Sequence, residues 1–390
     1  MCQPRNGLLK RTLKRTLFQL LRVGVSTAIL GFLVVQAKDS LPEIQGQPHW
    51  GLLALASLLC LLMVVTTIVR WYLLVRALEL PFRLRDAFRL GFLGYMLNFF
   101  SLGSVGGDLF RAVFIAREHA GRRAEAVATV FIDRLIGLYA LFLVATVAVL
   151  TTGLMDHSHE SIRLLCRVTL FCTGVSSLVV FFVLTPGFTK GRISTALANL
   201  PRIGPTIGKL LSAVRMYRRK LPTLLIAGLM SIAVHSLSAT AIYVAAQGLP
   251  GAAPGYAAHF LIVPLGMLAA AMPLSLSGLG LLDGVLDLLY VQIPTYPVAV
   301  GTGLMVGIAY RAITIGIAII GFIYYLANRA AVAQVMKHAE AQGETSGEGN
   351  GKESAEKNIE LPGRSARRVS PDAASKERTG STFEEPAGHR

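Results

Sequence analysis

Residues 101–126 read SLGSVGGDLFRAVFIAREHAGRRAEA, and this stretch decides how the chain is expected to fold. It places Gly106, Gly107, Asp108 and Arg111 between two apolar stretches. Because glycine tolerates positive φ, a non-helical turn at 104–107 would interrupt a membrane helix. A new half-helix would begin near Asp108, and its first amide groups would favour an anion. Arg111, one turn further along, can offer a bidentate fork to a phosphate group.

The rest of the chain has the composition of a membrane protein. Of 390 residues, 53% are hydrophobic and only 15% are charged, whereas soluble domains carry about 25% charged residues. Several apolar runs reach the roughly 20 residues that a bilayer-spanning helix needs. Full spans are predicted at 17–36, 50–72, 124–150, 163–185, 222–247 and 297–327, and two shorter stretches, 88–117 and 256–290, are broken by polar residues. These features predict an all-α polytopic membrane protein.

Loop charges predict the orientation of the spans. The N-terminal arm and residues 70–89, 117–123 and 186–221 are rich in Arg and Lys, so they should face the cytoplasm. The loops at 37–49, 153–162 and 248–255 should face outward. Stretch 88–117 then enters and returns on the inside, and stretch 256–290 enters and returns on the outside, as two oppositely oriented re-entrant hairpins. An alternative has eight spans, with 256–290 or 297–327 divided differently.

The two hairpins also resemble each other in sequence. SLGSVGGD ends at Asp108, and SLSGLGLLD ends at Asp283. Related sequences in two opposed hairpins are what an inverted-topology repeat produces.

Both termini are expected in the cytoplasm. The first apolar run is interpreted as an uncleaved span, and a signal peptide ending near Ala37 is the alternative. Residues 1–329 are expected to form the membrane domain, and residues 330–390, rich in Ser, Gly and charged residues, a disordered cytoplasmic tail. The net charge of +16 is concentrated in short loops, which favours topology signals over nucleic-acid binding.

Several ionisable residues are predicted at membrane depth. Each costs roughly 2.5–3.5 kcal/mol on insertion scales, so each should meet a partner or a wet cavity. Adjacent helical positions point about 100° apart, so Asp133 and Arg134 are expected to have different partners. Asp133 could meet Arg111 or Arg311, and Arg134 could meet Asp108. The alternative interpretation is structural, with Asp108 as a helix cap and a buried ion pair that locks the hairpins.

In the second half of the chain, Arg311 lies near the middle of a long apolar stretch. With Asp283 it is expected to form the counterpart of the Arg111 region.

Signatures of enzymes are lacking. The sequence contains no P-loop, no nucleophile elbow and no zinc-protease motif. Its four cysteines form no C-x-x-C pair. We therefore expect no enzymatic activity, no cofactor and no metal site.

The motif residues resemble those of the lysylphosphatidylglycerol synthase transmembrane-region family, also called the flippase-like domain family. The resemblance lies in NFFSLGSVGGDLFRA and DRLIGL, that is in Asn98, Gly106, Gly107, Asp108, Arg111, Asp133, Arg134 and Gly137. Looser matches are Pro273, Gly278, Gly280 and Asp283, and then Tyr310, Arg311 and Gly321. The chain differs from the family pattern at Leu102, where proline is frequent, and at Asp283, where glutamate is usual.

The resemblance implies a function in lipid transport. In the best-known members the membrane region moves an aminoacylated phospholipid between leaflets, and a separate soluble domain attaches the amino acid. Residues 330–390 are too short for such a domain. We therefore expect a lipid translocator in a bacterial inner membrane, in which a polar groove holds the head group of a phospholipid or lipid-linked substrate.

The alternative function is a membrane scaffold or accessory subunit for a separate lipid-modifying or glycosyl-transfer enzyme. Deleting residues 335–390 distinguishes the two, because a translocator should tolerate the loss and a docking protein should not.

Overall fold

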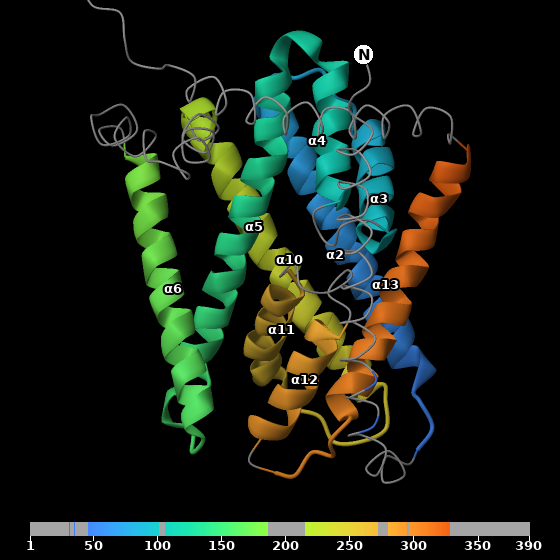
Figure 1. Cartoon of the computed structure of the whole chain (residues 1–390), viewed down its shortest axis with the longest axis vertical. Helices are drawn as coiled ribbons and strands as arrows, with labels where there is room; N and C mark the ends of the chain where they lie inside the picture. The colour runs from blue at the N-terminus through green and yellow to red at the C-terminus, as the bar shows by residue number, and fades with distance from the viewer. Residues whose placement is uncertain are drawn as a thin grey trace, which may run out of the picture. The chain divides into compact units, whose positions relative to one another are not determined.

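The computed structural model describes residues 46–100, 106–185, 215–271, 280–294 and 296–327, together with the single residues 31 and 35. Within these ranges the regular structure is entirely helical. Five helices are long and apolar enough to cross a membrane. They are α2 (Trp50–Ala77), α5 (Arg123–Thr151), α6 (Glu160–Leu184), α10 (Leu221–Gln247) and α13 (Thr302–Ala327) (Figure 1). They confirm five of the six predicted spans, and the first, at 17–36, falls almost entirely outside the described residues.

Four shorter helices replace the two broken stretches. The first stretch forms α3 (Leu84–Phe100) and α4 (Gly106–Glu118), and the second forms α11 (Tyr256–Ala271) and α12 (Leu281–Gln292). Each is shorter than the roughly 20 residues of a straight span. The two arms pack against each other in both stretches, so each stretch is a helical hairpin.

The first hairpin begins and ends at one end of the helix bundle, which we call the basic end. Here Arg122, just before α5, donates a 2.6 Å hydrogen bond to the carbonyl of Leu78, just after α2. The ring of His119, after α4, hydrogen-bonds the carbonyl of Pro81, before α3, at 3.1 Å. Lys220, before α10, donates to Glu79 at 2.8 Å, and this hydrogen bond lowers the pKa of the Glu79 carboxyl group.

The second hairpin begins and ends at the opposite end. There the amide of His49, before α2, donates to the carbonyl of Gly248, after α10, at 2.9 Å. The Tyr296 hydroxyl donates to the carbonyl of Ala253, just before α11, at 2.7 Å. The two hairpins therefore enter the bundle from opposite ends, as the loop charges predict (Figure 1).

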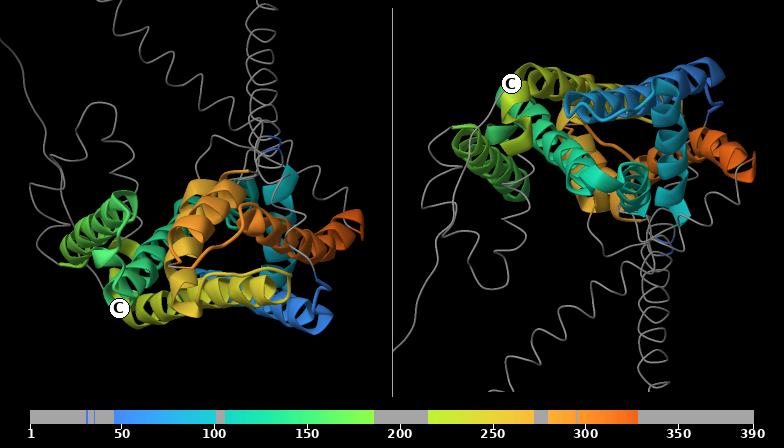
Figure 2. Two further views of the ribbon diagram at one scale, coloured as in Figure 1. Left: turned by 90° about the horizontal axis from the view of Figure 1, so that it is seen from below. Right: turned by 90° about the horizontal axis from the view of Figure 1, so that it is seen from above.

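The helices repeat in the same order in both halves of the described region. Helices α2 to α5 correspond to α10 to α13, and α2 and α10 lie side by side (Figure 2). Helix α3 packs on α13 as α11 packs on α5. Within the hairpins, Gly94 of α3 faces Gly107 of α4, and Gly266 of α11 faces Leu282 of α12. This correspondence in reversed direction is an inverted-topology repeat.

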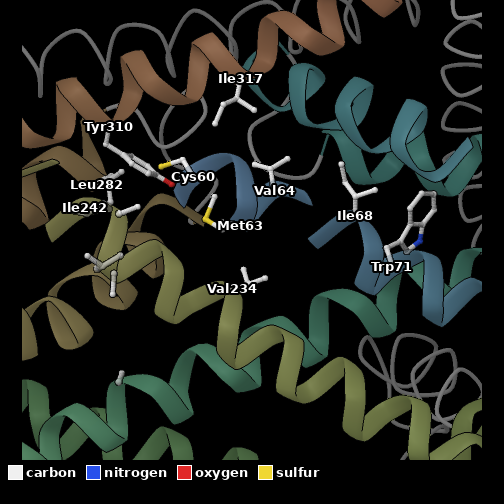
Figure 3. Packing of buried hydrophobic residues seen from close by; sticks show 14 of the residues in the cluster. Cys60, Met63, Val64, Ile68, Trp71, Val234, Ile242, Leu282, Tyr310 and Ile317 are labelled. Carbon is white, nitrogen blue, oxygen red and sulfur yellow. The ribbon is translucent and has the colours of Figure 1, made fainter. Parts of the chain in front are cut away.

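The core is centred on α2, and Figure 3 shows how its side chains meet those of the later helices. The buried side chains of α2 lie at helical spacing, which gives one continuous apolar face. The residues labelled there are Cys60, Met63, Val64, Ile68 and Trp71 from α2, Val234 and Ile242 from α10, Leu282 from α12, and Tyr310 and Ile317 from α13.

Candidate functional site

The first hairpin is closed by a bond between its two arms. The side-chain oxygen of Asn98, near the end of α3, accepts a 2.9 Å hydrogen bond from the amide of Gly107, in the first turn of α4. A Cβ atom at Gly107 would overlap the carbonyl oxygen of Gly94. The helices can therefore approach this closely only with glycine at position 107. Helix α4 begins at Gly106, two residues before the predicted start, so Gly106 and Gly107 are helical and not part of the turn predicted at 104–107; residues 104 and 105 of that turn lie outside the described residues.

Asp108 joins two arginines. One of its oxygens accepts a hydrogen bond from Nε of Arg134 in α5, and the other lies 3.7 Å from a guanidinium nitrogen of Arg111. The predicted pair of Arg134 and Asp108 is thus present in the structure. The Arg134 side chain is 51% exposed, whereas that of Asp108 is 13% exposed. These three residues, which we call the arginine cluster, carry a formal net charge of +1.

Arg111 is held from several sides although it is buried. It donates to the carbonyl of Gly91 at 3.2 Å, and its guanidinium carbon lies 5.4 Å from the ring centre of Trp71. Such a cation–π contact is strengthened by burial. A Cβ atom at Gly94 would come within 2.8 Å of the Arg111 Nε, so glycine there leaves space for the side chain. Among the described residues, the Arg111 Nε has no hydrogen-bond partner.

Asp133 pairs with a residue that the sequence did not predict. Its carboxylate lies 2.8 Å from Nε of Arg70 in α2, and Arg70 also donates to the Ser231 hydroxyl of α10 at 2.6 Å. The predicted partners Arg111 and Arg311 were therefore wrong.

The prediction failed because Arg70 was assigned to a cytoplasmic loop. Arg70 lies where the predicted span 50–72 overlaps the basic stretch 70–89. Helix α2 continues to Ala77, so Arg70 lies about two turns inside the helix and is buried. The sequence does contain a signal: Arg70 is followed by the apolar residues 71–75, which indicates that the helix continues past it.

The second hairpin contains a corresponding ion pair. Arg311 of α13 donates to Asp283 of α12 at 3.0 Å, and the same Asp283 oxygen accepts from the amide of Gly280. The predicted contact between Asp283 and Arg311 is present. This pair corresponds to Asp108 with Arg134 in the first half, because Arg311, like Arg134, lies on the long helix that follows its hairpin. It does not correspond to Asp108 with Arg111. In the place that corresponds to Arg111, three residues after the aspartate, stands Leu286.

Other polar residues of the two halves have structural contacts. Asp287 accepts hydrogen bonds from the amides of Gly301 and Leu304 and so fixes the start of α13. The ring Nε2 of His235 lies 2.9 Å from the carbonyl of Gly137 and donates to it. Gly321 packs against the backbone of Phe92. Pro273 and Gly278 of the family pattern lie outside the described residues.

In the described part of the chain, His, Cys, Asp and Glu side chains form no group of three that could hold a metal ion. The charged side chains described above form the arginine cluster and the pair of Arg70 and Asp133 in the first half, and the pair of Asp283 and Arg311 in the second.

Long apolar helices, opposed hairpins and buried ion pairs define the class as a multi-pass α-helical membrane protein. Within that class, the family model described as "Lysylphosphatidylglycerol synthase TM region" matches residues 19–321, and the chain belongs to this family. No curated protein sequence matches the chain.

Proposed function

We propose that the chain is a translocator that moves a phospholipid or a lipid-linked head group between the leaflets of a bacterial inner membrane, and that it is not itself an enzyme. The matched family region is a membrane region, which supports a role within the bilayer. Asn98, Gly106, Gly107, Asp108, Arg111, Asp133, Arg134, Asp283 and Arg311 are the residues proposed to form or support the head-group path.

The arginine cluster is the observation that carries this proposal. Arg111 and Arg134 share one carboxylate, and Arg111 is 6% exposed. A charge at membrane depth is expensive unless it is compensated. An anionic head group would add negative charge beside the two arginines, and a guanidinium group can supply paired donors to a phosphate.

The hairpin geometry supports the same function. The amides in the first turn of α4 carry a partial positive charge, which favours an anion next to the cluster. Arg134 lies half-exposed on α5, so a head group could reach the cluster from the surface of the bundle while its hydrocarbon chains stay in the bilayer.

The charges at the two ends support an orientation. The basic end contains Arg83, Arg85, Arg122, Arg218 and Lys220, and we propose that it faces the cytoplasm.

Leaflet exchange in proteoliposomes tests the function. Fluorescent phosphatidylglycerol, an aminoacylated phosphatidylglycerol and a polyprenyl phosphate are reconstituted with wild type, Arg111→Gln or Arg111→Lys. Losing a charge-assisted hydrogen bond costs about 1.5–3 kcal/mol, so Arg111→Gln should slow exchange roughly ten- to hundredfold. Arg111→Lys keeps the charge without the planar fork and should be intermediate.

Arg167→Gln is the matched control, because Arg167 is an exposed arginine on α6, outside the arginine cluster. It should exchange lipid like wild type. Equal rates for wild type and Arg111→Gln would contradict the site, and absence of exchange with all three lipids would contradict the function.

A further inference from the structure

A groove lies between three helices, in the half of the bundle farther from the basic end. Its volume is about 300 Å³, and its walls come from α5, α10 and α11. The lining is almost wholly apolar and includes Val144, Val147, Ala148, Ile232, Ala257 and Phe260. No charged residue lines it, so it is chemically distinct from the arginine cluster.

The groove opens to the membrane-facing surface. Val144 and Ala148 are buried and form its floor, whereas Val147, Ile232 and Ala257 are exposed and form its rim. Helices α5 and α10 both qualify as membrane spans, so their exposed faces lie against hydrocarbon. The molecules that can enter such a groove from the side are therefore the lipids of the bilayer.

The groove runs from the end of the spans inward. Thr151, the last residue of α5, and Tyr256, the first of α11, lie at its mouth. Leu143 lies eight residues deeper on α5, which corresponds to about 12 Å along the helix. This length and direction fit a hydrocarbon chain that enters the bilayer from the interface.

The hydroxyl groups at the mouth of the groove, those of Thr151 and Tyr256, already have protein partners. The Thr151 hydroxyl donates to the carbonyl of Val147 at 2.8 Å. The Tyr256 hydroxyl lies 3.0 Å from the Thr240 hydroxyl, and the Tyr256 ring packs edge-on against Phe260. At the mouth a ligand thus needs to supply apolar contact and no hydrogen bonds, and deeper in the groove Ser236 is the remaining polar residue of an otherwise apolar lining. An alkyl chain satisfies this requirement, and a polar ligand would lose its hydration without compensation.

We propose that this groove holds one hydrocarbon chain of a membrane lipid, with the head of that lipid at the level of Thr151 and Tyr256. The proposal does not depend on the proposed function, because a tightly held structural lipid would occupy the groove in the same way.

Photo-crosslinking tests the proposal. The full chain is placed in nanodiscs with a small fraction of phosphatidylglycerol that carries a diazirine in one acyl chain. Adducts are then mapped by mass spectrometry on the groove residues and on Leu229, an exposed residue of α10 outside the groove. Bound chains exchange more slowly than annular lipid, so groove adducts should exceed those at Leu229 several-fold.

Two variants fill the groove from different helices, Ser236→Phe on α10 and Ala257→Phe on α11. Either should reduce the groove adducts several-fold and leave the Leu229 region unchanged. Leu229→Phe adds the same bulk to the lipid-facing surface and should leave the groove adducts as in wild type. Groove labelling no higher than at Leu229, or labelling that persists in both filled variants, would overturn the proposal.

Discussion

At the scale of single residues, the pair of Arg70 and Asp133 fixes how three spans pack. Both side chains are 6% exposed, and with Ser231 they connect α2, α5 and α10. Removing one member of a buried ion pair leaves a buried charge without compensation, which costs about 3–5 kcal/mol. Replacing both members by apolar residues of similar size removes that penalty.

Asp133→Asn should therefore lower the free energy of unfolding by about 3–5 kcal/mol, because Arg70 stays buried and charged. The double change Arg70→Met with Asp133→Leu should recover most of the loss. Thermal unfolding in detergent, analysed as a double-mutant cycle, measures both. Glu79→Gln is the control, since the pair of Glu79 and Lys220 is exposed and its loss should leave the stability almost unchanged. A single variant as stable as wild type would contradict the assigned pair.

Residue contacts were predictable from sequence only where the order of the helices brings two charged residues together. Asp108 with Arg134 and Asp283 with Arg311 follow from an aspartate at the start of a half-helix and an arginine in the next span. The partner of Asp133 was missed because Arg70, within the predicted span 50–72, was counted with the basic stretch 70–89 that faces the cytoplasm. The pairing of α2 with α5 then depends on helix rotation, which the sequence does not give.

At the scale of elements, the first hairpin depends on the crossing of α3 and α4 at Gly94 and Gly107. The backbones approach so closely that a methyl group at 107 has no space. Overpacking of this kind costs typically about 1–3 kcal/mol. The hydrogen bond from the Gly107 amide to Asn98 would be displaced at the same time.

Gly107→Ala should destabilise the protein by about 1–3 kcal/mol and slow lipid exchange, because it separates the arms that position the arginine cluster. Gly228→Ala in α10 is the control, because a Cβ atom there meets nothing within 4 Å. That change should be neutral or stabilising by up to about 1 kcal/mol. Unfolding temperature and exchange rate measure both, and a harmless Gly107→Ala would refute the close crossing.

The boundaries of two spans were predicted to within one residue, because charged or polar residues end their apolar runs, whereas the end of α2 and the start of α13 were each predicted five residues away. The predicted span 124–150 became Arg123–Thr151, and 222–247 became Leu221–Gln247. The hairpins were predictable from loop charges rather than from their own hydropathy. Residues 101–105 and 272–279, between the arms of the two hairpins, lie outside the described residues.

At the scale of the whole membrane region, the inverted repeat relates its two halves. Its sequence signal is weak, because short Ser, Leu and Gly similarities are common in a chain with 38 glycines. The contacts establish the repeat, because corresponding helices pack together in both halves. Each half also contains an aspartate–arginine pair at the corresponding position. The difference between the halves, Arg111 against Leu286, became visible only through this correspondence.

Cysteine labelling from the two sides of the membrane tests the arrangement. In a background without the native cysteines, Gly121→Cys at the basic end should react with an impermeant maleimide only from the cytoplasmic side. Ser158→Cys and Gly255→Cys, at the opposite end, should react only from outside; all three positions are exposed. Labelling of Gly121→Cys and Gly255→Cys from the same side would contradict opposed hairpins.

Arg111 also makes the proposed transport sensitive to membrane voltage. The head groups of phosphatidylglycerol and of a polyprenyl phosphate carry a net negative charge, whereas the ammonium of an aminoacylated phosphatidylglycerol offsets its phosphate; moving one charge through 100 mV changes its free energy by about 2.3 kcal/mol. With the cytoplasm negative, an anionic lipid is pushed outward and its return is opposed. Transport of this kind is electrogenic, so the resting potential of the cell would set its direction without nucleotide hydrolysis.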